Sequence, residues 1–312
     1  MTAGEGTTVR QKVPRMRSAL YVPGHRLDFM AKVYRTGADA VILDLEDAVP
    51  AVRRAEARAT IEQWMAEPQS SRQIICVRIN APEQSCLDED LAACVSKALT
   101  AVQVPKVQTP ADVLCVDRAL ARQEQNAGLE EGVIRIWPLL ETPLGVRNAF
   151  EIAACSGRVA YMGGVASPNG DMARAMGYRE TGTFLETLYI RSKVLLDARA
   201  AGVPNPVSGM TPRIGDAAEL ERYANFVRSL GYEGMMAIHP SQVVVANAVF
   251  APGADELGGA RRLVEAFEAA GKEGQGATVH DGGMIDIAHY QTAQDLIARA
   301  EEFERRDKLA GD

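Results

Sequence analysis

The 312-residue sequence predicts a closed (β/α)8 barrel followed by a C-terminal helical extension. Short runs rich in branched residues alternate with segments of helical periodicity, and eight runs of this kind occur. Eight strands that alternate with helices favour a closed barrel over an open doubly wound sheet. Polar and charged residues also gather where the runs end, as expected for the functional face of a barrel. The runs are SALYVPG (18–24), AVILDLED (40–47), IICVRIN (74–80), VQVPKV (102–107), IRIWPLLET (134–142), VAYMGG (159–164), VPNPVSGM (203–210) and MMAIHP (235–240).

The predicted strands differ in strength, and apolar stripes between them predict helices that pack on the barrel. The run 203–210 is the weakest strand because two prolines interrupt it. A later helix begins at Asp216, where Glu219 completes a cap-like D-x-x-E pattern, and ends near Gly231. The stripes are Ala57, Ile61, Trp64 and Met65; Leu87, Leu91, Cys94 and Val95; and Leu220, Tyr223, Ala224 and Val227.

The two ends of the chain fall outside the predicted barrel, which covers residues 17–252. Residues 1–16 are polar and without pattern, so we expect a flexible tail. Residues 253–312 predict a helix near 255–270, a glycine-rich connector (GKEGQGATVHDGG) and a last amphipathic helix. An extension of this kind can pack on its own barrel or complete the active site of a neighbouring subunit.

Composition limits the classes of partner. The 34 basic and 41 acidic residues give a net charge of -7, which indicates no general attraction to nucleic acid or to an anionic membrane. No stretch approaches the roughly 20 apolar residues of a membrane helix, and the first 16 residues lack the apolar segment of a secretory signal. Five scattered cysteines without a CxxC motif favour a reducing compartment. We therefore expect a cytoplasmic protein that acts on small molecules.

Two acids are candidate metal ligands. Glu141 ends one apolar run, and Asp171 lies in a loop just after the next one. If both runs are parallel strands of one sheet, their carboxyl ends point the same way. One or two carboxylates, with water and substrate oxygens, make the usual magnesium site. The alternative for each acid is a solvated strand end.

Further charged residues follow neighbouring strands. Asp44, Glu46 and Asp47 would repel one another unless a cation lies nearby. Arg78 can be that cation, or it can clamp a carboxylate and stabilise an enolate, and both roles are compatible. We expect the three acids and Lys106 to support the site, with direct metal ligation by the acids as the alternative. A Schiff-base role for Lys106 needs a depressed pKa, for which the sequence gives no sign.

Several common sites are excluded by their missing motifs. The four histidines are dispersed, with no HxxxH or HxH pair, so a zinc site is not expected. His239, in AIHPSQ, ends the eighth run. The motifs GxSxG, GxGxxG and GxxxxGK[ST] are absent, which argues against serine-hydrolase, dinucleotide and P-loop sites.

Eight motifs, in order along residues 17–300, resemble the citrate lyase β-subunit-like family of the HpcH/HpaI aldolase/citrate lyase superfamily. Malyl-CoA, β-methylmalyl-CoA and citramalyl-CoA lyases belong to that family. The resemblance implies a TIM barrel of the pyruvate-binding superfamily and magnesium-dependent chemistry at a carbon–carbon bond beside an acyl thioester. The motifs are RSALYVPGHR, ADAVILDLEDAVP, VRIN, VPKVQTPADV, PLLETPLGV, GDMARAMG, GYEGMMAIHPSQV and GGMIDIAHYQTA.

The resemblance also implies roles for individual residues. Glu141 and Asp171 match the two ligands of Mg²⁺, and Arg78 matches the arginine that contacts the keto acid and the enolate oxygen. Asp286, in GGMID, matches a catalytic acid that reaches the active site of an adjacent subunit. That match implies a homo-oligomer, commonly a trimer or hexamer.

The implied function is cleavage of a 3-hydroxyacyl-CoA of the malyl, citramalyl or citryl type to a 2-keto acid and an acyl-CoA. The alternatives are a pyruvate-type aldolase of free acids and a citrate lyase β subunit that acts on an acyl carrier. Three departures from the family pattern stand out. The metal loop VASPNGDM is longer than the usual GAEDL, Met235 or Met236 replaces a common basic residue, and Arg54 replaces a lysine.

Overall fold

The computed structural model describes residues 13–67, 73–82, 86–163 and 170–308. The chain separates into two compact units, Met1–Ala248 and Val249–Asp312. The expected tail over residues 1–16 lies outside the described residues as far as residue 12, and so does most of the longer metal loop, residues 164–169.

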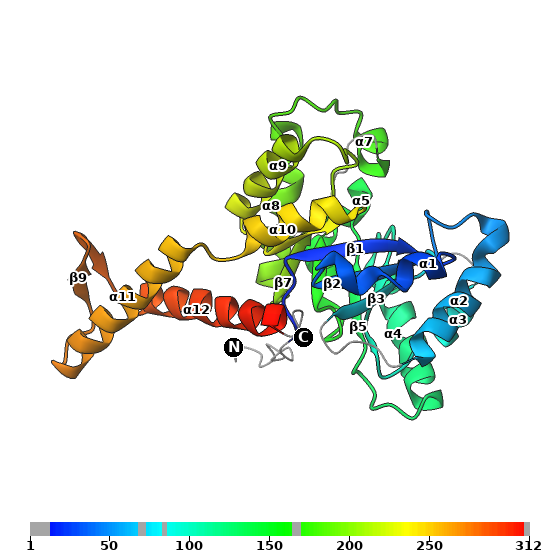
Figure 1. Ribbon diagram of the computed structural model, residues 1–312, viewed down its shortest axis with the longest axis horizontal. Coiled ribbons are helices and arrows are strands. Elements are labelled where there is room, and N and C mark those ends of the chain that lie inside the picture. Colours follow the sequence, from blue (N-terminus) through cyan, green and yellow to red (C-terminus); the bar gives the residue numbers. More distant parts are fainter. Residues whose placement is uncertain (1–12, 68–72, 83–85, 164–169, 309–312) are drawn as a thin grey trace, which may run out of the picture. The chain divides into compact units, whose positions relative to one another are not determined.

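Eight parallel strands form the centre of the first unit (Figure 1). They pair in the order β5-β4-β3-β2-β1-β8-β7-β6, so the first strand lies beside the eighth. The two ends of this order meet through parallel bridges at Ile136–Val159 and Leu139–Gly163. The predicted barrel is therefore confirmed as nearly closed. Its strands are β1 (Ser18–Pro23), β2 (Ala40–Asp44), β3 (Ile74–Arg78), β4 (Leu99–Val104), β5 (Arg135–Pro138), β6 (Tyr161–Gly163), β7 (Asn205–Ser208) and β8 (Gly234–Ala237).

Helices follow the strands, and the predicted stripes face the interior. Ala57, Ile61, Trp64 and Met65 are all buried. Asp216 caps its helix by accepting the N–H of Glu219, and Gly231 ends it at φ 109°. The helices are α1 (Leu27–Met30), α2 (Arg54–Ala66), α3 (Leu87–Ala92), α4 (Pro110–Asn126), α5 (Pro143–Arg147), α6 (Ala149–Ala154), α7 (Asp171–Met176), α8 (Leu185–Ala200), α9 (Ala217–Leu230) and α10 (Pro240–Phe250), with short 3₁₀ turns at Val33–Thr36 and Ala51–Arg53.

The strands separate two apolar cores by simple alternation. On β2, Val41 and Leu43 join the core between strands and helices, whereas Ala40 and Ile42 join the core inside the barrel. Successive side chains of a strand point to opposite faces. Asp44 therefore falls on the inward face, at the carboxyl end of the strand. At this end of the barrel the apolar core is therefore followed by polar residues such as Asp44.

The second unit contains α11 (Ala254–Lys272) and α12 (Ile287–Lys308), joined by a hairpin of β9 (Thr278–His280) and β10 (Gly283–Ile285). Part of the segment expected to be a glycine-rich connector is thus an antiparallel hairpin. Ala293, Ala300 and Phe303 of α12 are buried. Phe267 and Tyr290 stack at 5.0 Å between ring centroids and join the two helices.

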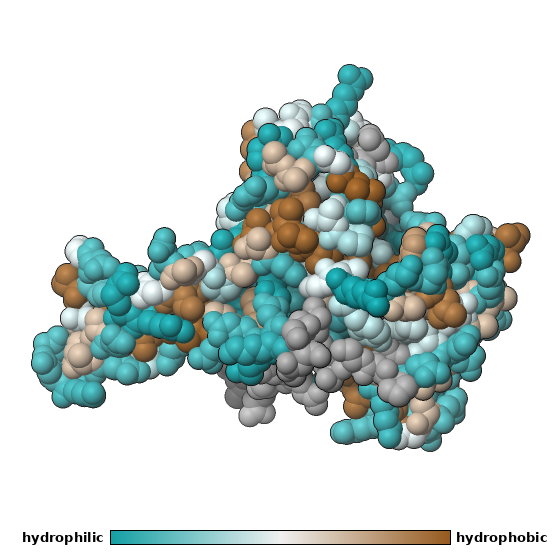
Figure 2. All heavy atoms as spheres, in the orientation of Figure 1, coloured by the Kyte–Doolittle hydropathy of each residue, from teal (hydrophilic) through white to brown (hydrophobic). Residues whose placement is uncertain are grey.

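Over the described ranges, no helix is both long and apolar enough to cross a bilayer. The face shown in Figure 2 is largely hydrophilic, with hydrophobic residues in separate groups.

Candidate active site

Two adjoining cavities open where the barrel strands end. The larger holds about 420 Å³ and is lined by residues from the ends of several strands, among them Tyr21, Asp44 and Arg78. The smaller holds about 280 Å³ and includes Lys106. Glu141, Asp171 and Arg174 line both cavities. The carboxyl ends of the strands are where a (β/α)8 barrel places its active site.

A buried ion pair stands at the base of the larger cavity. Asp44 and Arg78 are the last residues of β2 and β3, and the parallel register sets them opposite each other. Both guanidinium contacts to Asp44, through Nε and Nη2, measure 2.6 Å. Asp44 also accepts the backbone N–H groups of Glu46 (3.0 Å) and Ala48 (2.9 Å). The arginine is therefore held in one orientation by a carboxylate whose own position is fixed by the backbone.

Glu46 links this ion pair to Lys106. Its carboxylate lies 3.0 Å from Arg78 Nη1 and 2.6 Å from Lys106 Nζ. Lys106 adopts φ 54°, an uncommon conformation for a residue with a side chain. Partial burial by itself lowers the pKa of Lys106, but Glu46 and the nearby acids raise it above its ordinary value. A charged lysine of this kind does not suit the Schiff-base role, and the residue instead neutralises acids around the cavity.

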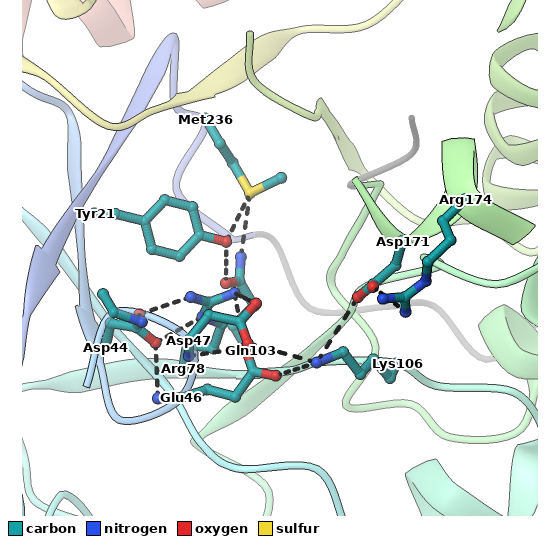
Figure 3. A network of polar contacts seen from close by, with 11 residues as sticks. Tyr21, Asp44, Glu46, Asp47, Arg78, Gln103, Lys106, Asp171, Arg174 and Met236 are labelled. Carbon is teal, nitrogen blue, oxygen red and sulfur yellow. Dashed lines mark hydrogen bonds and ion pairs between the residues drawn. The ribbon is translucent and has the colours of Figure 1, made fainter. Parts of the chain in front are cut away.

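A group of residues inside the barrel lies against the arginine (Figure 3). The Tyr21 ring lies 4.8 Å from the guanidinium carbon of Arg78. The Tyr21 hydroxyl donates to Gln103 (2.6 Å) and approaches the Met236 sulfur (3.3 Å), while the Gln103 amide also contacts that sulfur (3.4 Å). Tyr21 and Gln103 were not predicted from the sequence, and Met236 was named there only as a possible replacement of a basic residue. Gln103, a lone polar residue between valines in a predicted strand, was the available signal.

Glu141 reaches the junction of the cavities from the segment that links β5 to α5. Thr142 caps α5 by accepting the N–H of Gly145. A Cβ at position 145 would lie 2.3 Å from the carbonyl oxygen of Val107, so only glycine allows α5 to pack this closely. The PLLETPLG motif is thus a tight strand-to-helix turn that fixes the position of Glu141.

Asp171 approaches the same junction as the first residue of α7. Its carboxylate lies 2.7 Å from Arg174 Nη2 and 3.8 Å from Lys106 Nζ. Figure 3 shows Asp171 and Arg174 turned toward Lys106, across from the Arg78 ion pair. The spacing of Asp171 and Arg174, one helical turn apart, makes this contact predictable from sequence once α7 is assigned.

The charges around the junction favour a cation. Five acids (Asp44, Glu46, Asp47, Glu141, Asp171) and three bases (Arg78, Lys106, Arg174) form the cluster, and with all eight ionised three minus five leaves a charge of -2.

Burial raises the pKa of Glu141 to about 7; Arg78 and Lys106 lower it, and Glu46 and Asp47 raise it further. Burial likewise raises the pKa of Glu46. A divalent cation would therefore relieve an unfavourable concentration of negative charge.

The donor set suits magnesium better than zinc. In the part of the chain that the structure describes, no three His, Cys, Asp or Glu side chains form a metal-binding group. Structural or catalytic zinc takes at least three such ligands, whereas magnesium takes one or two carboxylates and completes its shell with water and substrate oxygens. Glu141 and Asp171 fit the second pattern.

The remaining candidates, Asp286 and His239, are not among the residues that line the two cavities. Asp286 belongs to the second unit, where His289 Nδ1 lies 2.6 Å from its carboxylate and holds the pKa of Asp286 below its ordinary value. Its role therefore stays a prediction. His239 is exposed and contacts Ser241 at 2.8 Å.

Comparison with known proteins shows which family the chain resembles over most of its length. The model of the HpcH/HpaI aldolase/citrate lyase family matches residues 17–240. The citrate lyase subunit beta of Escherichia coli K12 is 31% identical over 292 residues, which cover 94% of this chain and 95% of the relative. A (3S)-malyl-CoA thioesterase of Cereibacter sphaeroides ATCC 17025 is 32% identical over 285 residues, covering 91% and 94%.

A solved structure is similar over almost the same length. Protein CitE from Mycobacterium tuberculosis, in complex with magnesium, acetoacetate and coenzyme A, superposes with a TM-score of 0.71 and 27% identity. The match covers 91% of this chain and 97% of that one. Together these matches confirm the resemblance that the sequence motifs indicate.

Proposed function

The chain belongs to the HpcH/HpaI aldolase/citrate lyase family, and on that premise we propose that it is a magnesium-dependent carbon–carbon lyase. Its substrate is a 3-hydroxyacyl-CoA, and its products are a 2-keto acid and an acyl-CoA. The observation that carries this proposal is the meeting of Glu141, Asp171 and Arg78 around one cavity whose charge cluster is negative by two. The magnesium, acetoacetate and coenzyme A bound by the Mycobacterium tuberculosis protein support it.

In this proposal Glu141 and Asp171 hold Mg²⁺, and Arg78 stabilises the negative charge that develops during cleavage. A magnesium ion acts as a Lewis acid toward hydroxyl and carboxylate oxygens. Arg78 has five N–H donors, more than its contacts with Asp44 and Glu46 use, and it lines the cavity. It donates hydrogen bonds to the thioester enolate that remains when the carbon–carbon bond breaks. Because the ion pair with Asp44 fixes its orientation beforehand, little reorganisation is needed at that moment.

Asp286 of a neighbouring subunit supplies the proton transfer at the enolate carbon in this scheme, within a homo-oligomer. A carboxylate with a lowered pKa is ionised at neutral pH, which suits proton removal in the condensation direction. In the cleavage direction the substrate hydroxyl loses a proton as its carbon becomes the keto carbon, and the enolate carbon gains one, so the same carboxyl must take up a proton before it can donate one. Packing against another copy would raise its pKa by desolvation.

The second candidate is hydrolysis of the thioester, which the similarity to a (3S)-malyl-CoA thioesterase favours. Two other activities remain alternatives. One is cleavage of free hydroxy-keto acids, and the other is action on an acyl carrier as a citrate lyase β subunit, the name that the Escherichia coli relative bears.

One assay separates these activities. Malyl-, β-methylmalyl-, citramalyl- and citryl-CoA are incubated with the full chain, with Mg²⁺ or with EDTA, and both keto acid and free thiol are measured. The lyase releases keto acid without free thiol, whereas a thioesterase releases thiol without keto acid. Magnesium-dependent keto acid release from at least one thioester is expected. Release of thiol alone would contradict the lyase. If none of the four thioesters gave keto acid or thiol, carrier-bound or free-acid substrates would be tested next.

A further inference from the structure

Gln103 stands in one row with the residues of the buried ion pair. The parallel register sets Asp44 opposite Arg78, and Arg78 opposite Gln103, on three neighbouring strands. Residues that lie opposite one another in a sheet share a face, so all three side chains point into the barrel. Gln103 is fully buried and is not among the residues that line the two cavities. Any effect of its amide on the cavity must therefore pass through a neighbour.

That neighbour is Tyr21, which connects the amide to Arg78 (Figure 3). The Tyr21 hydroxyl donates to the side-chain carbonyl of Gln103 at 2.6 Å. The guanidinium carbon of Arg78 lies over the Tyr21 ring, 4.8 Å from its centroid. Burial raises the pKa of Tyr21 far above its ordinary value, although Arg78 opposes that rise, so the phenol keeps the hydrogen that it donates. One short hydrogen bond thus fixes the far end of the ring on which Arg78 lies.

Stability alone does not explain an amide at this position. Within the described part of the chain, the Gln103 NH₂ group contacts a thioether, the Met236 sulfur, at 3.4 Å. Sulfur is a weak acceptor, and a buried amide with incomplete hydrogen bonds costs free energy that an apolar side chain avoids. Exceptions of this kind to an apolar core are expected at functional sites. Gln103 is therefore better explained by what it does for Tyr21 and Arg78.

The Arg78 guanidinium is held along one edge and on one face. Asp44 accepts from Nε and Nη2 at 2.6 Å and so fixes the edge. Tyr21 covers a face, where a cation in a desolvated site gains on the order of 2 kcal/mol. The guanidinium has five N–H donors, so others remain for a ligand in the cavity that Arg78 lines. The edge contact sets where these donors lie, and the ring sets the tilt of their plane.

We propose that Gln103 is a positioning residue for the reaction, because it anchors the Tyr21 ring and thereby sets the tilt of the Arg78 guanidinium. This inference rests on the proposed function, in which Arg78 stabilises the thioester enolate, and it adds a residue to that function. Donors that stabilise a developing charge must be in place before the charge forms, since reorganisation during the step lowers the rate. Gln103 meets this requirement from outside the cavity.

The test removes the anchor at either end. Gln103→Leu removes the carbonyl, and Tyr21→Phe removes the hydroxyl but keeps the ring over Arg78. For the thioester that the wild type cleaves fastest, we expect each variant to lower kcat by about tenfold and to leave KM within about twofold, because misplaced donors affect the transition state more than the bound substrate. The double variant should be no slower than either single one, since both changes remove the same hydrogen bond.

Gln73→Leu is the matched control. Gln73 is also a buried glutamine, and its side chain donates to the carbonyl groups of Val33 and Ala38 at 3.3 and 3.0 Å. It is not among the residues that line the cavities. The same substitution should therefore lower the stability measured by urea denaturation and leave kcat unchanged. If Gln103→Leu does not give the circular dichroism of the folded protein, Tyr21→Phe, which removes a single oxygen, is used in its place.

A spectroscopic readout separates the inference from the proposed function. The Arg78 Nε–H donates to Asp44 in a buried site, so its proton resonance reports the position of the guanidinium without any substrate. Loss of the resonance in Arg78→Lys assigns it. We expect Gln103→Leu and Tyr21→Phe to shift this resonance and Gln73→Leu to leave it in place.

Keto acid release by the wild type, with unchanged kcat in both anchor variants, would overturn the inference and leave the proposed function intact. An unshifted Arg78 resonance in both variants would also overturn it, and so would a loss in the double variant equal to the product of the single losses. Absence of keto acid release by the wild type from every thioester would instead overturn the proposed function, whatever the resonance shows.

Discussion

At the residue scale, Asp44 stabilises the fold and orients Arg78, and both roles depend on the same buried ion pair. Its side chain is fully buried and accepts two backbone N–H groups as well as the Arg78 guanidinium. Burial of an unpaired arginine is costly, so the carboxylate stabilises the fold and also orients Arg78, to which we assign a catalytic role in the proposed function.

This leads to a prediction for Asp44→Asn. The neutral amide offers one oxygen acceptor in place of two and leaves the buried guanidinium underneutralised. We expect the free energy of unfolding to fall by about 3 kcal/mol, with lyase activity lost, as measured by urea denaturation and keto acid release. Arg53→Gln, which breaks an exposed pair with Glu56, is the matched control and should change stability by less than about 1 kcal/mol. Equal effects of the two variants would contradict the assigned role.

Glu141 predicts a dependence of stability on pH. Burial raises its pKa to about 7 from an ordinary value of 4.5, so between these pH values the folded protein keeps a proton that the unfolded chain has lost. Stability is therefore lost as pH rises through this window, and Glu141→Gln escapes that loss. Without metal, the variant should be about 3 kcal/mol more stable than the wild type at pH 8 and nearly equal to it at pH 4.5.

Thermal unfolding in EDTA at the two pH values checks this. Added Mg²⁺ should then stabilise the wild type at pH 8 and leave Glu141→Gln unchanged. If Glu141→Gln were less stable than the wild type at pH 8 without metal, the claim that ionised Glu141 destabilises the metal-free fold would be refuted.

Residues that carry charge at strand ends could be predicted from sequence, while their partners inside the barrel could not. The pattern of β2 and β3 places Asp44 and Arg78 at neighbouring strand ends and already suggests their contact. Tyr21, Gln103 and Met236 meet only through the stagger of β1, β4 and β8 around the barrel. No local pattern encodes that stagger, so their contact required the structure.

At the scale of elements, the turn between β5 and α5 determines where Glu141 lies. Gly145→Ala would force a Cβ against the Val107 carbonyl oxygen and displace the start of α5. We expect a loss of about 2 kcal/mol in stability, measured by urea denaturation, together with weaker Mg²⁺ binding. Gly157→Ala, where no atom lies within 4 Å of the added Cβ, is the control and should be close to neutral. If Gly145→Ala bound Mg²⁺ as tightly as the wild type, the turn would not be what positions Glu141 for the metal.

Strands and helices of the barrel were predictable because their apolar periods are strong. The β7 segment remained a strand although Pro206 lies within it, because the strand is only four residues long and its carbonyl groups still accept hydrogen bonds. The hairpin of β9 and β10 was missed, since glycines around a three-residue strand hide the alternation on which a prediction depends.

At the scale of the whole molecule, the proposed function assigns Asp286 to the active site of a neighbouring subunit. The proposal predicts that two inactive variants complement each other. Asp286→Asn keeps a complete barrel site, and Glu141→Gln keeps the carboxylate that the neighbour needs. Random mixing after subunit exchange should restore about a quarter of the wild-type activity, because each functional site needs one half from each variant.

Keto acid release after mixing, with each variant alone as control, measures this complementation. Light scattering on the same samples reports the oligomer. No recovery despite proven exchange would place Asp286 either in its own subunit's site or outside catalysis.

The most direct test of the whole account is metal binding itself, since it depends on no choice of substrate. Mn²⁺, used as a paramagnetic substitute for Mg²⁺, is titrated into the wild type, Glu141→Gln, Asp171→Asn and Asp286→Asn and followed by electron paramagnetic resonance. The account predicts one Mg²⁺-displaceable ion per chain in the wild type and in Asp286→Asn, and a loss of at least about 100-fold in affinity in the other two variants. Undiminished binding in both Glu141→Gln and Asp171→Asn would contradict it.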